Sequence, residues 1–162
     1  KPIGLDAMEI IRIEGGAPRL GVDFAGADTP GAGSARRTPA ALGLGHLAPT
    51  ERSWFNGRRA LRSGSVPPRV LVGLGIDADR ASPGALVFGR KGAAVGRITS
   101  CAFSPRMKRV VAFADIAAEA QGSPIEVECA GPTGLRAPAG LLETAESRRA
   151  AAALAEPRTS DG

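Results

Sequence analysis

Six short apolar segments, separated by turn-forming residues, make up most of the second half of the sequence. They cover residues 69–76, 85–90, 93–103, 109–116, 125–129 and 135–142. They are rich in Val, Ile, Leu and Ala, and the stretches DADRASPG, KG, QGSP and AGPTG lie between them. Because β-branched residues favour strands and Gly, Pro, Asp and Ser favour turns, this part predicts a small antiparallel β-barrel or sandwich.

The sequence begins with a helical pattern. Leu5, Met8 and Ile11 recur at helical spacing, and two glycines then interrupt the pattern, so we expect a short helix that ends near Glu14. The run AGADTPGAGSARRTP at 25–39 has little to bury and predicts a loop.

Two further elements are expected before the barrel. Residues 42–47 alternate between apolar residues and glycine or histidine, which is typical of a strand. The sequence NGRRALRSG, residues 56–64, predicts one or two helical turns closed by Gly64.

These patterns divide the chain into three parts. Residues 1–62 are too few and too rich in loops to bury a full core alone, so we expect them to be the end of a larger domain. Residues 63–143 form the predicted barrel, and residues 144–162 are charged and then Ala-rich, which predicts a disordered tail.

The composition narrows the classes of function. The formal net charge of +5 favours anionic partners, but the basic pairs are scattered without interleaved aromatic residues, which argues against nucleic-acid binding. Two cysteines and one histidine are too few for a zinc site or a disulfide framework. We find no membrane-spanning run and no signal peptide, so a cytoplasmic location is expected.

Glu14 is the first candidate for a binding role. It follows an apolar helix and precedes two glycines, where a ligand could approach the backbone closely. Its two carboxylate oxygens can accept a pair of N–H donors, such as the edge of a pterin or a purine presents. An ordinary surface carboxylate is the alternative interpretation.

Other candidate motifs lack what their chemistry requires. The stretch VLVGLGID has neither the third glycine nor the following helix of a dinucleotide-binding turn. Cys101 has no nearby histidine and is interpreted as a buried strand cysteine, while the lone His46 is interpreted as structural.

The stretch WFNGRRAL, residues 54–61, contains the only tryptophan of the chain. We expect Trp54 and Phe55 to be large apolar anchors that pack where the first part of the chain meets the barrel. The adjacent Arg58 and Arg59 face either a ligand or water.

Six motifs, in order, carry a family resemblance. They are IRIEGGAPRLGVDF, TPAALGLG, SWFNGRRAL, RVLVGLGID, AAVGRITSCAFSP and KRVVAFADI. Together they resemble the glycine-cleavage T-protein (aminomethyltransferase) family, whose corresponding patterns include L-R-x-E-A-G, T-P-x-E-x-G-L-G, F-x-G-[RK]-x-A-L and V-G-x-V-T-S with a following S-P. The resemblance covers roughly residues 4–142.

The resemblance implies an α+β chain: the end of a folate-binding α/β domain followed by a small six-stranded antiparallel β-barrel. It implies tetrahydrofolate as the cofactor and matches Glu14 to the family's pterin-binding glutamate. A basic residue ahead of the F-x-G stretch contacts folate in the family. Arg52 matches it best and Arg58 is the second choice, since Arg suits the carboxylates of the folate tail.

The chain also departs from the family pattern. Ala41 replaces the glutamate of T-P-x-E, Leu20 stands at a common tyrosine position, and the chain contains no tyrosine. The family's catalytic aspartate belongs to an N-terminal half that this sequence does not contain. The sequence therefore looks like a fragment that assigns no catalytic residue and should not transfer aminomethyl groups by itself.

The resemblance leaves other functions open. One is a folate-binding factor for iron-sulfur cluster assembly or tRNA modification, although the K-G-C-x-x-G-Q-E signature of that class is missing. Another is a transferase module behind a flavin-dependent sarcosine or dimethylglycine dehydrogenase. A third is a non-catalytic barrel that binds anions or a protein. The implied partners are folate and either a lipoyl carrier protein or a flavin dehydrogenase, with no membrane and no nucleic acid.

Overall fold

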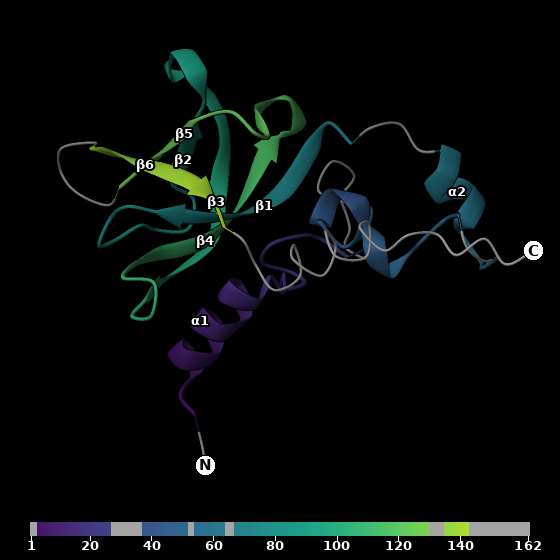
Figure 1. The fold of residues 1–162 in the computed structure, drawn as a ribbon, viewed down its shortest axis with the longest axis horizontal. Coiled ribbons are helices and arrows are strands. Elements are labelled where there is room, and N and C mark those ends of the chain that lie inside the picture. Colours follow the sequence, from purple (N-terminus) through teal and green to yellow (C-terminus); the bar gives the residue numbers. More distant parts are fainter. Residues whose placement is uncertain (1–2, 27–36, 52–53, 64–66, 130–134, 143–162) are drawn as a thin grey trace, which may run out of the picture.

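The computed structural model describes residues 3–26, 37–51, 54–63, 67–129 and 135–142 (Figure 1). Its main feature is a closed barrel of six antiparallel strands in the order β1-β4-β3-β2-β5-β6. The strands are β1 (Arg69–Ile76), β2 (Leu86–Phe88), β3 (Ala94–Ser104), β4 (Arg109–Ala117), β5 (Ile125–Glu128) and β6 (Arg136–Leu141). The predicted six-stranded antiparallel barrel is confirmed, and each strand lies within two residues of its predicted bounds.

Strand pairing closes the barrel through β1, which joins β4 on one side and β6 on the other. The long strands β3 and β4 form a hairpin in which Ser104 pairs with Arg109. Closure gives each strand a neighbour on both sides, so the sheet has no edge strand of the kind that promotes strand-to-strand aggregation.

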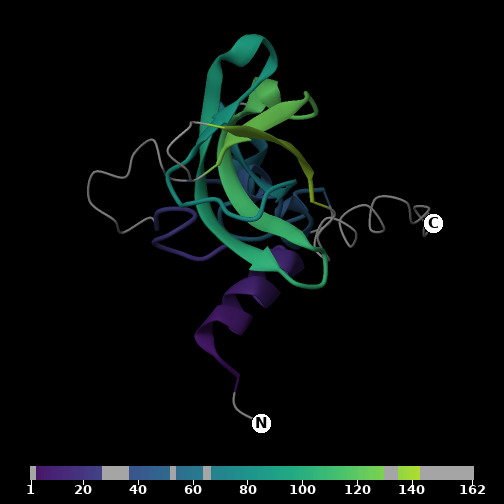
Figure 2. The ribbon, with the colours of Figure 1, turned by 90° about the vertical axis from the view of Figure 1, so that its left-hand side faces the viewer.

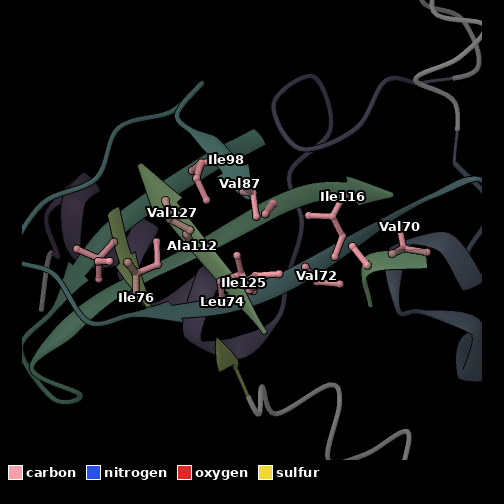
Figure 3. Close-up of a cluster of buried hydrophobic side chains, with 14 residues drawn as sticks. Val70, Val72, Leu74, Ile76, Val87, Ile98, Ala112, Ile116, Ile125 and Val127 are labelled. Carbon is pink, nitrogen blue, oxygen red and sulfur yellow. The ribbon is translucent and has the colours of Figure 1, made fainter. Parts of the chain in front are cut away.

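The barrel interior is filled by small and branched apolar side chains (Figure 3). The buried members of this cluster are Val70, Val72, Leu74, Ile76, Val87, Ile98, Val110, Ala112, Ala114, Ile116, Ala120, Ile125, Val127 and Ala137. Alternate residues of β1 and β4 point inward because side chains alternate between the two faces of a strand.

A second apolar cluster lies outside the barrel wall and explains why β1 and β4 are apolar on both faces. Leu71 of β1 and Val111 and Phe113 of β4 pack there against the buried Ile13. Ile13 belongs to helix α1 (Leu5–Gly15), which lies against β3 and β4 (Figure 2). A strand that is covered on both faces has a nearly continuous run of apolar residues in its sequence.

The predicted helix is confirmed, and it ends where the glycines indicated. Gly16 adopts the left-handed conformation at φ 84°, and its N–H is directed to the carbonyls of Arg12 and Ile13. The apolar spacing, however, does not mark the buried face: Leu5, Met8 and Ile11 are exposed, and Ile13 makes the core contact.

The strand predicted at 42–47 is wrong. The segment forms two 3₁₀ turns instead, η2 (Ala40–Leu42) and η3 (Gly45–Leu47). Gly43 between them has φ 75°, and the Thr38 hydroxyl accepts from the Ala41 N–H at 3.2 Å. Glycine in the left-handed region permits a turn that a β-branched residue would resist.

The helical turns predicted around Arg58 are confirmed as α2 (Arg58–Ser63). The remaining 3₁₀ turns are η4 (Arg90–Gly92) and η5 (Ala118–Ala120). The tail at 144–162, the capping Gly64 and most of the predicted loop at 25–39 lie outside the described residues. The division at 62/63 therefore stays a prediction.

Within the described part of the chain, no helix is both long and apolar enough to cross a bilayer.

Candidate functional site

Glu14 lies in the last turn of α1 and points toward the end of β3. The Ser104 hydroxyl donates to its Oε1 at 2.5 Å, and Arg106 donates to its Oε2 from Nε at 3.0 Å and from Nη2 at 2.9 Å. Ser104 is fully buried and its Oγ also accepts from the Met107 N–H at 3.0 Å. Glu14 therefore links α1 to the β3–β4 turn.

The two oxygens of Glu14 differ in how open they are. The Glu14 side chain is 15% exposed, whereas Arg106 is 65% exposed. Because Arg106 lies on the surface, its pairing with Oε2 is open to solvent and only weakly stabilising. A ligand with N–H donors could take the place of Arg106 at Oε2 while Ser104 keeps Oε1 in position.

Arg58 and Arg52, the two residues matched to the folate tail, are not brought to Glu14. The Nε of Arg58 donates to the Thr50 carbonyl at 2.5 Å, and no contact within the described part of the chain joins it to Glu14. Arg52 lies outside the described residues.

The expectation that Trp54 is a large apolar anchor between the first part of the chain and the barrel is wrong. Its side chain is 79% exposed, so it is not a buried anchor between the two parts of the chain. It shares a hollow with residues of α2, and α2 stands away from the barrel in Figure 1. Among the described residues, those that share a hollow with Trp54 are Arg58, Arg59 and Arg62 of α2. Charged side chains such as these usually stay at the surface and do not enclose an indole as a packed apolar core does.

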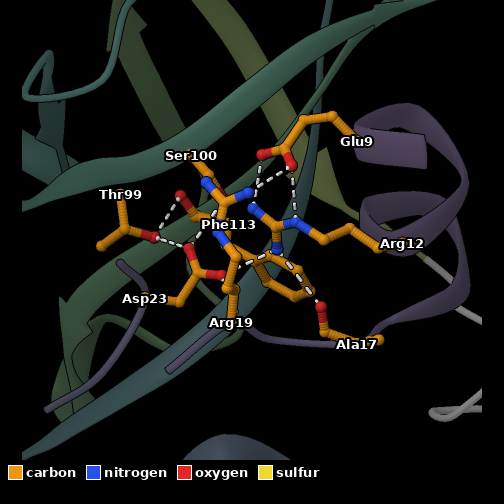
Figure 4. A network of polar contacts seen from close by, with 8 residues as sticks. All are labelled: Glu9, Arg12, Ala17, Arg19, Asp23, Thr99, Ser100 and Phe113. Carbon is orange, nitrogen blue, oxygen red and sulfur yellow. Dashed lines mark hydrogen bonds and ion pairs between the residues drawn. The ribbon is translucent and has the colours of Figure 1, made fainter. Parts of the chain in front are cut away.

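Sequence reasoning missed Asp23, which is the most buried polar residue among those described in the N-terminal part (Figure 4). Its side chain is completely buried, with 0% exposed. The hydroxyls of Thr99 and Ser100 both donate to Oδ1 at 2.6 Å, and Oδ2 accepts from the Arg19 N–H and from Arg12 Nη1 at 2.8 Å each. All lone-pair directions of this carboxylate are thus occupied by protein donors.

A β-bulge makes this arrangement possible. In the β3–β4 ladder Ile98 pairs with Ala114 and Ser100 with Phe113, so Thr99 is an extra residue. Neighbouring side chains of a regular strand point to opposite faces, whereas a bulge can re-aim one of them. Thr99 and Ser100 consequently reach the same oxygen of Asp23.

Arg12 connects the Asp23 carboxylate and its hydroxyl partners to α1. Besides Asp23, it donates to Glu9 from Nε at 2.8 Å and from Nη2 at 2.5 Å, and its guanidinium lies 5.8 Å from the Phe113 ring centroid. The hydrogen bond from Arg12 lowers the pKa of Glu9 below the ordinary 4.5, against a smaller opposing effect of burial. These contacts hold the helix on the barrel, and the four donors on Asp23 leave its carboxylate no free lone pair for a ligand.

The sequence carried a weak signal for the contacts of Asp23 with Arg12, Thr99 and Ser100. Arg12 and Asp23 both lie in the IRIEGGAPRLGVDF motif, and Thr99 and Ser100 lie in the V-G-x-V-T-S match. Nothing in the sequence indicated that two motifs separated by more than seventy positions meet at one carboxylate.

The departures from the family pattern also have structural consequences. Ala41, which replaces a glutamate, is fully buried in η2, and η2 lies against β1. Leu20, at the tyrosine position, is exposed. Neither position supplies a polar group for a ligand.

Cys101 is half-buried in β3, and its Sγ lies 3.4 Å from the Ala81 carbonyl. Burial raises the pKa of its thiol, and the negative charge of Glu9 adds to the shift. A raised thiol pKa opposes nucleophilic chemistry at neutral pH.

Comparisons with known proteins agree with this architecture. The family described as the glycine cleavage T-protein C-terminal barrel domain matches residues 69–144. Aminomethyltransferases of Corynebacterium jeikeium and Streptomyces coelicolor are 34% and 35% identical over 142 and 119 residues, which cover 80% and 70% of this chain. A trimethylamine-oxide aldolase of Ruegeria pomeroyi is 34% identical over 134 residues, or 78% of this chain.

A solved structure extends the match to the fold. The glycine cleavage system aminomethyltransferase T of Bartonella henselae superposes with a TM-score of 0.66 and 25% identity, over 89% of this chain and 39% of that one. The matched part of the chain spans 34% and 30% of the two aminomethyltransferases and 16% of the aldolase. The chain therefore belongs to the aminomethyltransferase-like glycine cleavage T-protein family, and its residues 69–144 match the C-terminal barrel domain of that family.

Proposed function

We propose that this chain binds tetrahydrofolate as part of an aminomethyltransferase that moves a one-carbon unit from an amine to folate. The observation that carries the proposal is the position of Glu14. The glutamate that matches the family's pterin ligand is held by Ser104 where the helix meets the barrel, and among the described residues the exposed Arg106 alone covers its second oxygen.

The hydrogen-bond acceptors of the Glu14 carboxylate fit a pterin. A pterin edge offers adjacent N–H groups, and a carboxylate with one oxygen anchored by a buried hydroxyl is a pre-oriented acceptor for them. In this proposal Glu14 orients the ring, and Arg52 or Arg58 pairs with the carboxylates of the folate tail. The residues of this chain bind and orient, because the family's catalytic aspartate belongs to a region outside the matched segment.

The related proteins favour this function over the two folate-dependent alternatives. Aminomethyltransferases from two bacterial genera are each about one third identical to this chain, at 34% and 35%. The matched lengths of 142 and 119 residues exceed the barrel and therefore include residues of the N-terminal part. The lipoyl carrier protein stays a proposed partner, since the basic net charge of +5 favours an acidic protein surface.

Calorimetric titration of tetrahydrofolate, under anaerobic conditions, tests the proposal. Glu14→Gln keeps an oxygen for Ser104 but removes the charge, and we expect it to weaken binding about tenfold or more, the cost of one charged hydrogen bond. Glu119→Gln is the matched control, because Glu119 is an exposed glutamate of η5 on the barrel.

The experiment tests folate binding and the role of Glu14 separately. If the unmodified chain shows no saturable heat with tetrahydrofolate, folate binding is wrong for this chain. If it binds and Glu14→Gln binds equally well, the ligand site lies elsewhere and the role of Glu14 is structural.

A further inference from the structure

Three consecutive residues attach the last turn of α1 to the rest of the chain. Ile13 is fully buried against β1 and β4. Arg12 donates to Asp23 at 2.8 Å, and Glu14 accepts from the Ser104 hydroxyl at 2.5 Å. Successive residues of an α-helix are about 100° apart around its axis. Arg12 and Glu14 therefore lie on opposite flanks of Ile13, and each flank has its own polar attachment.

One face of β3 receives both attachments. In the β3–β4 ladder Ser100 pairs with Phe113, and Ala102 pairs with Val111. Phe113 and Val111 belong to the apolar cluster outside the barrel wall, and directly opposed side chains share a face of the sheet. Ser104 is two residues further along β3 and continues this face. Ser100 and Ser104 are about 13 Å apart, four residues at the rise of a strand.

Each of these serines is buried and binds one carboxylate (Figure 4). The Ser100 hydroxyl donates to Asp23 at 2.6 Å, in the same way as Ser104 donates to Glu14. Asp23 is also fixed from its own loop, because its Oδ2 accepts from the Arg19 N–H and its N–H donates to the Arg19 carbonyl at 2.9 Å. Asp23 is thus a fixed point on the barrel wall to which Arg12 is bound.

Contacts on both flanks are what stops a helix from rolling on a surface. The apolar contact of Ile13 cannot prevent a roll, because the hydrophobic effect is non-directional. At the outer radius of a helix, about 5–6 Å, a roll of about 20° moves the end of a side chain by about 2 Å. The hydrogen bond between Glu14 and Ser104 would not survive such a shift. The pairing of Arg12 with Asp23 opposes the roll from the other flank.

We propose that Asp23 is a positioning residue for Glu14. Asp23 holds Arg12, Arg12 fixes the rotation of α1 on the barrel, and this rotation keeps the Glu14 carboxylate on Ser104 in the orientation that a ligand meets. Asp23 itself touches no ligand. The inference rests on the proposed function for the identity of that ligand, whereas the coupling between Asp23 and Glu14 can be measured without it.

A double-mutant cycle measures this coupling by urea unfolding. Ser104→Ala should lower the folding equilibrium constant of the unmodified chain about tenfold or more, the effect of one hydrogen bond to a charged group. In the Asp23→Asn background α1 can roll, so the same change should lower the constant less than about threefold. Substitutions more than about 10 Å apart normally have additive effects, so this difference reports coupling through α1.

Val127→Ala is the matched control for a loss of stability. Val127 is fully buried in β5, which pairs with β2 and β6 and not with the strands under α1. In this background Ser104→Ala should have the same effect as in the unmodified chain. If Asp23→Asn does not fold, Ser100→Ala takes its place in the cycle, because Thr99 still donates to Asp23 in that variant.

Calorimetric titration of tetrahydrofolate measures the consequence for binding, at a temperature at which urea unfolding shows every variant to be folded. Asp23→Asn places an amide NH₂ opposite the donors of Arg12 and Arg19, and we expect it to weaken binding about tenfold. Val127→Ala should change the affinity less than about twofold. In the Glu14→Gln background Asp23→Asn should add less than about twofold, because its effect passes through Glu14.

The results separate this inference from the proposed function. The positioning role is overturned if Ser104→Ala has the same effect in all backgrounds, or if folded Asp23→Asn binds tetrahydrofolate as tightly as the unmodified chain. It is also overturned if Val127→Ala weakens binding as much as Asp23→Asn. If the unmodified chain does not bind tetrahydrofolate, the proposed function is wrong, and the unfolding cycle alone decides whether Asp23 positions Glu14.

Discussion

The Asp23 carboxylate lies 2.6 Å from the Ser100 hydroxyl, although the two residues are 77 positions apart in the sequence. The contact joins the segment after α1 to the barrel wall, and Thr99 and Arg12 complete it. Because the Asp23 side chain is fully buried, the attachment of the N-terminal part to the barrel depends on a charged group that only protein donors neutralise.

Removal of this carboxylate should destabilise the chain strongly. Asp23→Ala removes one of the two carboxylate partners of the partly buried Arg12 and takes the described acceptor away from the Ser100 hydroxyl and the Arg19 N–H. We therefore expect a loss of about 3–5 kcal/mol. Urea unfolding followed by circular dichroism measures it. Asp79→Asn, at an exposed turn position, should change stability by less than about 0.5 kcal/mol. Equal effects of the two changes would contradict the role assigned to Asp23.

Two strand glycines should respond oppositely to the same added methyl group. A Cβ at Gly96 of β3 would meet the Asp115 carbonyl oxygen and would lie 2.8 Å from Ile116 Cα, whereas a Cβ at Gly140 of β6 would meet nothing within 4 Å. Gly96→Ala should therefore cost about 1–3 kcal/mol or more, and Gly140→Ala should be neutral or slightly stabilising. Thermal unfolding of the two variants side by side checks this pair.

Glu9 should make stability depend on pH in the acid range. Its pKa is lowered in the folded chain by the hydrogen bond from Arg12, so its contribution is present above the ordinary value of 4.5 and disappears as pH falls through the lower folded pKa. Glu9→Gln should be less stable than the unmodified chain at pH 7, and the difference should shrink below pH 4.5. Urea unfolding at a series of pH values between 7 and 3 measures it. A constant difference over that range would rule out this linkage.

Arg106 should compete with a ligand for Glu14. Under the proposed function, Arg106→Ala uncovers Oε2 and should raise tetrahydrofolate affinity several-fold, while it costs no more than about 1 kcal/mol of stability because the pair is exposed on the Arg106 side. Calorimetric titration measures the affinity, with Arg90→Ala on the exposed turn η4 as the control for loss of one positive charge. Weaker binding in Arg106→Ala would mean that Arg106 contacts the ligand rather than replacing it.

The barrel could be predicted from local patterns because strand alternation and turn chemistry act between near neighbours. The run Arg69–Ile76 is apolar along its length, and it forms a strand with those bounds. The glycines after Glu14 stop the first helix for an equally local reason, since Gly16 takes a left-handed conformation that other residues resist. The order of the motifs also indicated the family.

The candidate site followed from the sequence only in part. Glu14 was found through its motif, but its partners Ser104 and Arg106 were not, because they come from a turn 90 residues and more away. Residues 42–47 alternate as a strand does and still form 3₁₀ turns, because no neighbouring strand pairs with them and Gly43 permits the bend.

The sequence by itself determined the six strands, the first helix and the residues of the family motifs, all of which depend on contacts between residues close in the chain. Only the tertiary structure decided that Ile13, and not Leu5 or Ile11, would be buried, and that Trp54 would remain exposed. It also decided that the Thr99 bulge would turn two hydroxyls toward Asp23. These outcomes depend on which surfaces meet across the barrel wall, and that information is not contained in the spacing of residues along one segment.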